Sequence, residues 1–124
     1  AYQLGDLYEE TGSQMEAITE FERALAAKPD DALASELKYR IGACREQLGE
    51  KNEAILAYEK AMNGGPKTDP FRLLAVARCA ALYEEKESWK KAVGAYRDLI
   101  KNSQDDELVM AANERVAQLE AAAR

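Results

Sequence analysis

Histidine is absent from the 124-residue chain. Its absence removes the side chain that most often serves as general base, as triad member and as metal ligand. The chain has two cysteines, and no other cluster of ligands accompanies them to complete the four ligands of a structural zinc site. We therefore predict a protein that is not an enzyme and that carries no metal and no other cofactor.

The two cysteines, Cys44 and Cys79, stand on the apolar faces of two expected helices. We interpret both as buried thiols that pack like small hydrophobic side chains. A disulfide between them stays open as an alternative, and it would require Cα atoms within about 7 Å of each other. So small a number of cysteines favours a reducing compartment.

Long apolar runs are missing as well. No stretch approaches the roughly 20 residues that a membrane-spanning helix needs, so we predict no membrane insertion by this chain. Acidic residues outnumber basic ones by 23 to 17, for a formal net charge of −6, which argues against a nucleic acid partner. The chain opens at Ala1-Tyr2 without Met or signal peptide. We expect a fragment of a longer chain, and both cytoplasm and periplasm stay open.

What the chain does contain is a regularly spaced set of small and aromatic residues. In its first copy, Gly5, Ala17 and Ala24 stand where two helices must approach each other closely. Tyr8 and Phe21 fill the space that these small residues leave. The pattern predicts two antiparallel helices in contact.

Residues that start and stop helices punctuate the same stretch. Gly12 is typical of a helix end, and Ser13 with Glu16 is typical of a capping box at the start of the next helix. Pro29 is expected to end the second helix. The longer first helices further along share an acidic start signal, at Asp31, Asp69 and Asp106.

The pattern recurs every 37 or 38 residues. The pair Leu4-Gly5 is followed at these intervals by Ile41-Gly42, Cys79-Ala80 and Val116-Ala117. The segment Ala17-x3-Phe21 is likewise followed by Ala54-x3-Tyr58 and Ala92-x3-Tyr96. A period held over four copies indicates a repeat protein, in which each unit buries its apolar face against the next.

The spacing resembles the tetratricopeptide repeat, a helical hairpin with small residues at the helix crossing. The resemblance implies an all-α fold, a right-handed superhelix (α-solenoid) of about three hairpins plus a C-terminal helix. We expect one domain over 1–124, with units at about 1–30, 31–67 and 68–105 and a final helix over 106–124. The usual period is about 34 residues. The longer units here resemble those of bacterial cell-envelope tetratricopeptide proteins, of the Tol-Pal accessory or β-barrel assembly lipoprotein type.

Seven helices are predicted, at about 1–10, 14–27, 32–48, 52–62, 70–86, from 89 onward and 107–122. The fifth is apolar on nearly all sides, so we expect it to be buried. The loop before it, Gly64–Thr68, superficially resembles a phosphate-binding loop. It lacks the preceding strand and has Pro66 where a donor is needed, so we interpret it as a connector. The acidic pairs Asp30-Asp31 and Asp105-Asp106 are interpreted as helix caps and first-turn acids rather than a cation site.

In the tetratricopeptide family the first helix of each unit lines an inner groove, in which partner peptides lie. The resemblance carries this role over to residues of three helices. The first unit contributes Tyr2, Asp6, Glu9 and Glu10. The second contributes Glu36, Tyr39, Arg40, Ala43, Glu46 and Gln47. The third contributes Leu74, Ala77, Arg78, Ala81, Glu84 and Glu85. Alanines would form a shallow floor and acids one rim, so we expect an apolar or mildly basic partner.

One subclass is excluded, because members that clamp the C-terminal carboxylate of chaperones present Lys and Asn at inner positions that hold Tyr, Asp and Ala here. We therefore predict a non-catalytic protein–protein interaction scaffold that binds a peptide or helix in its concave groove. Two alternatives stay open. One is a structural module that self-associates through its apolar edges, and the other is an accessory domain of an enzyme whose active site lies outside these residues.

Overall fold

The computed structural model describes residues 13–122, and this part of the chain is helical throughout, without strands. Its helices are α2 (Gln14–Ala26), α3 (Asp31–Gln47), α4 (Lys51–Met62), α5 (Pro70–Glu85), α6 (Trp89–Asn102) and α7 (Asp106–Ala122). Each begins within a residue or two of the helix predicted there, and all but α6, for which no end was predicted, also end within a residue or two of it. The helix predicted over 1–10, with Gly12 at its end, lies outside the described residues.

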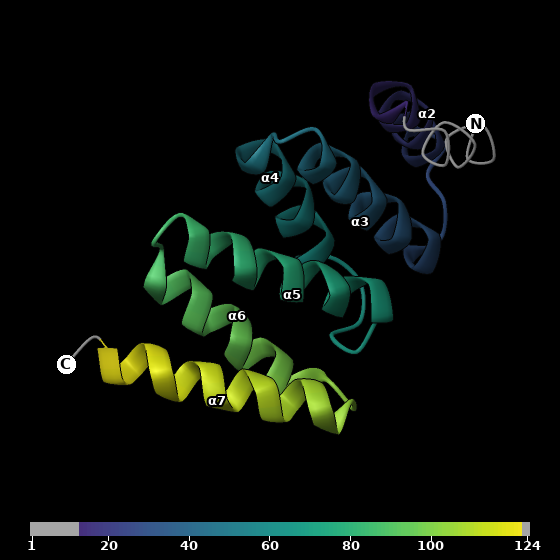
Figure 1. The fold of residues 1–124 in the computed structure, drawn as a ribbon. Coiled ribbons are helices and arrows are strands. Elements are labelled where there is room, and N and C mark those ends of the chain that lie inside the picture. The colour runs from purple at the N-terminus through teal and green to yellow at the C-terminus, as the bar shows by residue number, and fades with distance from the viewer. Residues whose placement is uncertain (1–12, 123–124) are drawn as a thin grey trace.

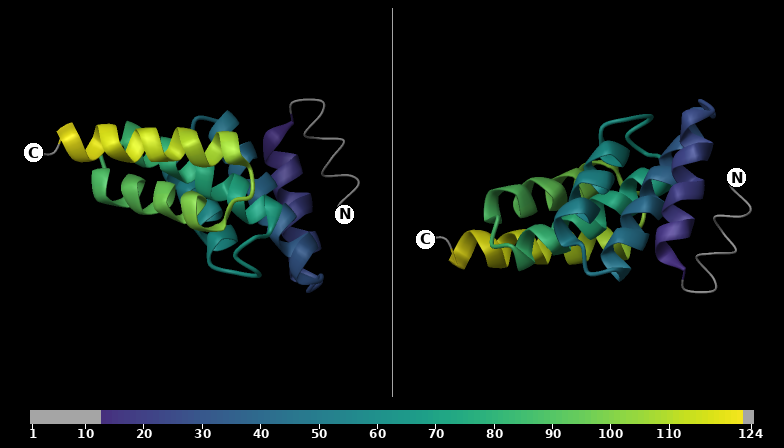
Figure 2. Two further views of the ribbon diagram at one scale, coloured as in Figure 1. Left: turned by 90° about the horizontal axis from the view of Figure 1, so that it is seen from below. Right: turned by 90° about the horizontal axis from the view of Figure 1, so that it is seen from above.

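The helices form a solenoid of antiparallel hairpins. Each one packs against the helices before and after it in the chain, and α3 also packs against α5. Figure 1 shows α3, α5 and α7 running in a similar direction, with α4 and α6 crossing between them. In Figure 2, α2 crosses the stack at one end, next to α3. This arrangement confirms the all-α solenoid expected from the sequence.

Aspartates start three of the longer helices, although two of the three start signals were placed one residue too late. The carboxylate of Asp69 accepts hydrogen bonds from the backbone N–H groups of Phe71 and Arg72, both at 3.0 Å. At the other two starts the capping carboxylates are those of Asp30 and Asp105 rather than Asp31 and Asp106. These bonds satisfy amides that have no partner within the helix. In each acidic pair the first residue, Asp30 or Asp105, is the capping residue, and the second, Asp31 or Asp106, lies in the first turn of the helix.

The capping box predicted at Ser13 and Glu16 does not form. Ser13 does stand at the N-cap of α2, but its side chain accepts no hydrogen bond from the first turn. Its φ of −85° and ψ of 74° depart from the extended conformation typical of such a cap. Thus the helix starts where it was predicted to start, but the predicted hydrogen bond to the Ser13 side chain is absent.

Helices α3 and α5 end in the same way with different residues. After α3 the chain takes a left-handed conformation at Gly49, with φ of 79°, and after α5 it does so at Glu87, with φ of 59°. In both cases the next residue donates its backbone N–H to a carbonyl five residues back, as in a Schellman motif. Glycine adopts this conformation at little cost, whereas glutamate does not.

The interior consists of two apolar clusters along the seams between helices. One joins α2 to α3 and contains Phe21, Leu37 and Cys44. The other runs from α4 to α7 and contains Tyr58, Cys79 and many small residues. Both cysteines are buried and neither forms a disulfide, as predicted. Burial raises the pKa of the Cys79 thiol to about 12, so it stays protonated.

The prediction that α5 is buried nearly all round holds except at its first residue and along one face, where Leu74, Arg78 and Glu85 are exposed. Leu74 is 45% exposed, and it stands one helical turn before Arg78 on the same face of the helix. An arginine, in contrast, is among the most buried side chains. Arg72 is 2% exposed and donates to the carbonyls of Met62 (2.8 Å) and Lys67 (2.9 Å) and to the Asp98 carboxylate. Arg72 holds the loop between α4 and α5 against α6, and this role was not predicted from the sequence.

Among residues 13–122, none of the helices combines the length and the apolar character that crossing a bilayer requires. In the same part of the chain, no three His, Cys, Asp or Glu side chains gather closely enough to hold a metal ion.

Candidate functional site

The candidate groove residues that the structure describes lie on two neighbouring helices. Those on α3 are Glu36, Tyr39, Arg40, Ala43, Glu46 and Gln47, and those on α5 are Leu74, Ala77, Arg78, Ala81, Glu84 and Glu85. Because α3 packs against α5, the two sets lie beside each other (Figure 1). The candidates of the first unit, Tyr2, Asp6, Glu9 and Glu10, lie outside the described residues.

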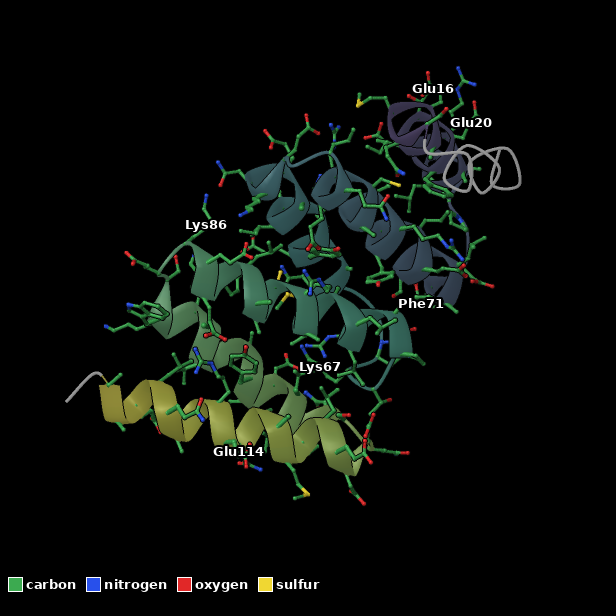
Figure 3. The ribbon with its side chains drawn as sticks, in the orientation of Figure 1. Glu16, Glu20, Lys67, Phe71, Lys86 and Glu114 are labelled. Carbon is green, nitrogen blue, oxygen red and sulfur yellow. The ribbon has the colours of Figure 1, made fainter. Side chains whose placement is uncertain are left out.

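A hollow of about 230 Å³ lies where these two helices meet. Five of its lining residues are predicted groove residues, namely Tyr39, Ala43, Glu46, Gln47 and Arg78. The sixth, Tyr58, comes from α4 and was not predicted. Its ring lies 5.8 Å from that of Tyr39, which in turn lies 6.0 Å from Phe71 of α5. Figure 3 shows Phe71 on the first turns of α5, toward α3. The hollow therefore has an aromatic wall.

Glu46 is the centre of the polar contacts in this hollow. Its carboxylate accepts a hydrogen bond from the Tyr58 hydroxyl at 2.9 Å and one from Nε of Arg78 at 3.1 Å. It also accepts one from Nη2 of Arg78. Partial burial by itself would raise the pKa of Glu46, but these hydrogen bonds outweigh it and hold the pKa below its ordinary value of 4.5. Glu46 is therefore ionised and fully engaged at neutral pH.

The same three-residue arrangement recurs in the next repeat. Glu84 of α5 accepts hydrogen bonds from the Tyr96 hydroxyl of α6 and from Arg115 of α7, whose Nε lies 2.8 Å away. The bond from Arg115 lowers the pKa of Glu84, against the effect of burial. Burial and the bond to Glu84 raise the pKa of Tyr96 to about 12, so its hydroxyl remains a donor.

Sequence reasoning missed the partners Tyr58, Tyr96 and Arg115, although a signal for them was present. The two glutamates stand 38 residues apart, as do the two tyrosines, and Arg78 and Arg115 stand 37 apart. These are the intervals of the repeat itself. Charged residues that keep the period of the apolar ones indicate a contact between units, and that contact could have been read from the spacing.

These ion pairs change the expected charge of the groove. We predicted a rim of free acids, but Glu46 and Glu84 are each paired with an arginine. The arginine is also the more exposed member, at 45% for the Arg78 side chain against 22% for Glu46, and 41% for Arg115 against 16% for Glu84. A molecule entering the groove therefore meets guanidinium groups first, and the expected acidic rim is wrong for these two residues.

The remaining candidates do not line the hollow. Arg40 pairs with Glu36 on its own helix at 3.0 Å. Glu85 pairs with Lys51, at the start of α4, at 3.1 Å. Ala77 and Ala81 are half-buried on α5, and Ala77 packs against the apolar cluster that runs from α4 to α7.

A second hollow of about 240 Å³, which was not predicted, lies over α3 between α2 and α4. Its apolar lining includes Leu25, Ile41 and Leu56, and charges of both signs surround it. Leu56 is 59% exposed. No candidate residue from the sequence contributes to it.

A comparison with known families identifies the repeat. The family model described as tetratricopeptide repeat matches residues 1–31 and 35–63. No curated protein matches the chain. Tetratricopeptide repeats are in general protein–protein interaction modules. The chain is therefore similar to tetratricopeptide repeat proteins over residues 1–31 and 35–63, and its helical hairpins continue beyond the matched residues.

Proposed function

We propose that this chain is a non-catalytic scaffold that binds a segment of a partner protein in the groove between α3 and α5. The observation that carries the proposal is the hollow lined by Tyr39, Ala43 and Arg78, where two successive units contribute to one surface. Two units that line one hollow can each contact a single bound segment, and this is how repeat proteins build extended binding surfaces.

The chemistry of the hollow favours recognition over catalysis. The carboxylate of Glu46 already accepts hydrogen bonds from Tyr58 and Arg78, so it is not placed to act as a general base. The sequence contains no histidine to replace it. What is left for a partner is a half-buried tyrosine ring, a short alanine side chain and polar groups at the edge. A few placed polar groups around an apolar surface are typical of a binding site.

The partner proposed from the sequence was apolar or mildly basic. The apolar part of that proposal is supported by the two tyrosine rings that line the hollow, those of Tyr39 and Tyr58. The basic part loses its support, because the acids Glu46 and Glu84 are neutralised by arginines that are more exposed than they are. The comparisons give no support for a place among the cell-envelope proteins of the family, and the proposal does not depend on one.

The proposal can be tested with peptides selected from a phage-displayed library on the wild-type chain. Ala43→Arg places a long cationic side chain in the hollow and Ala81→Arg does so further along the groove. Each variant should weaken the selected peptides at least tenfold, about 1.4 kcal/mol, with little change in melting temperature. Matched controls are Gln118→Arg and Ala121→Arg, at exposed positions of α7.

Self-association through the edge of α7 is the competing function, and Met110 favours it because it is 68% exposed there. Figure 3 shows Glu114 on the same helix, on the side away from α5. If Ala43→Arg and Ala81→Arg leave peptide affinity intact while Gln118→Arg or Ala121→Arg removes it, the groove is not the binding site. Light scattering on the purified chain then measures assembly through the edge directly.

A further inference from the structure

We propose that a third hollow, between α4 and α6, binds an acidic segment of a second partner protein. An apolar side chain of that segment enters the hollow, and its carboxylates pair with Lys86, Lys90 and Lys91. The inference does not depend on the groove proposed above, because the two hollows share no lining residue. Together the two sites let one chain hold two partners at once.

The third hollow has a volume of about 280 Å³. Its apolar lining consists of Ile55 and Leu56 of α4 and the ring of Tyr83 of α5. A further hollow of about 360 Å³, beside Trp89 of α6, adjoins it, since Lys91 lines both. Leu56 is 59% exposed and Trp89 is 47% exposed. Apolar surface that gathers around a hollow in this way marks an interaction site, and tryptophan is enriched among the residues that contribute most to binding.

The size of the third hollow fits one side chain of a larger partner. Pockets that enclose whole small molecules measure roughly 300–1,000 Å³, and the third hollow lies below that range. The exposed side chains of Leu56 and Trp89 beside it provide contact area for the rest of a protein segment.

The local charge has the opposite sign to that of the whole chain, whose formal net charge is −6. Three lysines and two glutamates line the two adjoining hollows, namely Lys86, Lys90, Lys91, Glu59 and Glu87. The carboxylate of Glu59 already accepts a hydrogen bond from the Tyr83 hydroxyl. An excess of positive charge around an apolar hollow is complementary to an acidic partner.

None of the three lysines pairs with a carboxylate within residues 13–122. The Nζ group of Lys86 donates to Oδ1 of Asn52, and Figure 3 shows Lys86 at the end of α5 that lies nearest to α4. The Nζ group of Lys91 lies 5.8 Å from the centre of the Tyr83 ring. Neither contact supplies a negative charge, so the lysines are available to carboxylates of a partner.

The placement of two of these lysines is unfavourable for the helix that carries them. Lys90 and Lys91 stand in the first turn of α6, which contains no acid. Positive side chains there oppose the helix macrodipole, whereas acids would be favourable. Binding therefore accounts for a charge pattern that helix stability does not.

An anionic lipid surface fits this site less well than an acidic protein segment does. Proteins recognise such surfaces with clusters of about 4–8 lysines and arginines, whereas here three lysines stand beside Glu59 and Glu87. The apolar surface is also hollowed, so it receives a side chain of its partner.

The experiment uses two displayed peptide libraries as probes. Every peptide has Leu, Phe or Trp at its centre, flanked by Asp and Glu in one library and by Asn and Gln in the other. Binders are measured against wild type, Lys90→Glu/Lys91→Glu and Leu56→Gln. The matched control is Lys28→Glu/Lys101→Glu, which changes the net charge equally at exposed positions that line neither hollow. Ala43→Arg tests whether a binder lies in the groove instead.

We expect binders from the acidic library alone. Their affinity should fall at least about tenfold with Lys90→Glu/Lys91→Glu and with Leu56→Gln, and should stay within about twofold with the control pair and with Ala43→Arg. The melting temperature of Lys90→Glu/Lys91→Glu should stay level or rise, because acids in the first turn favour the helix. A lower melting temperature together with lost affinity would mean that the lysines support the fold, and the inference would be wrong.

Other outcomes would also overturn it. Equal numbers of binders from the two libraries, binders that tolerate the lysine exchange, or no binders at all would each do so. Binders displaced by Ala43→Arg would belong to the groove and would leave only the proposed function standing.

Two other occupants of the site are tested on the purified chain. Sedimentation with phosphatidylserine vesicles that is lost in Lys90→Glu/Lys91→Glu would assign the surface to a membrane. A dimer that light scattering detects, and that the same variant dissociates, would assign it to a second copy of the chain. Either result would overturn the assignment to an acidic partner protein.

Discussion

The ring of Tyr58 occupies the space in which any side chain at Gly42 would have to lie. A β-carbon built on Gly42 would come within 2.5 Å of Cε1 and 2.6 Å of Cδ1 of that ring. Tyr58 is only 1% exposed and is held by its hydroxyl bond to Glu46, so it has little room to move. The close crossing of α3 and α4 thus depends on the missing side chain.

Gly42→Leu should therefore lower the free energy of unfolding by about 1–3 kcal/mol or more, because overpacking forces the helices apart. The loss should exceed that of Leu33→Ala, since Leu33 is only half-buried. Gly94→Ala is the control, because an added β-carbon there meets nothing within 4 Å. Urea denaturation measures all three. A Gly42→Leu variant as stable as wild type would show that the second repeat unit was aligned wrongly.

Glu87 ends α5 in the left-handed conformation that Gly49 adopts after α3. Glu87→Gly should remove the strain of the β-carbon and raise the free energy of unfolding by about 0.5–1 kcal/mol. Gly49→Ala should change it in the opposite direction by a similar amount. Because Glu87→Gly also removes a charge, Glu87→Gln serves as the control and should be nearly neutral. Equal stability of the glycine and glutamine variants would contradict the prediction.

Arg72 connects three parts of the fold, so its removal should be costly. Arg72→Met keeps most of the side-chain volume but takes the charged partner from Asp98 and the donor from two backbone carbonyls. We expect a loss of about 3–5 kcal/mol, as for other buried pairs that lose one member. Arg97→Met is the matched control, because Arg97 and Glu120 are 60% and 47% exposed, and such surface pairs contribute about 0–1 kcal/mol.

Hydrogen exchange locates the effect. Amides of the loop between α4 and α5 should exchange faster in Arg72→Met, since Arg72 holds the carbonyl of Lys67 in that loop. If stability drops while this loop remains as protected as in wild type, Arg72 acts through packing in α5 and not through the loop.

Stability should fall in acid because of the two glutamates between units. The pKa values of Glu46 and Glu84 lie below the ordinary 4.5 in the folded protein, so the unfolded chain takes up protons first as the pH falls. Their contribution is complete above about pH 4.5 and is lost as the pH drops below that value through the folded-state pKa values. Denaturation midpoints between neutral pH and about pH 3 measure the slope. The double variant Glu46→Gln/Glu84→Gln should show a shallower fall, and an unchanged slope would contradict the assignment.

The repeat and the helix positions could be predicted because their signals are local. Glycine, proline and aspartate mark helix ends through their own backbone and side-chain preferences, and a period of 37 or 38 residues needs no knowledge of contacts. The groove was predicted by position, and Tyr39, Ala43, Glu46, Gln47 and Arg78 do meet at one hollow. The charge of the groove was not predicted. Glu46 and Arg78 are 32 residues apart in the sequence, and each could have paired with many other charged residues. Arg72 was missed for a similar reason, since in an amphipathic pattern an arginine is read as a surface residue.

The pairs Glu46–Arg78 and Glu84–Arg115 each connect an inner helix to the inner helix of the next unit, so they act along the direction in which the solenoid extends. Bending the solenoid open would stretch them, and bending it closed would compress them. They therefore help to hold successive units at a fixed angle. Since all four side chains are partly exposed, dissolved salt screens both ion pairs, and we expect the angle between successive units to vary with ionic strength.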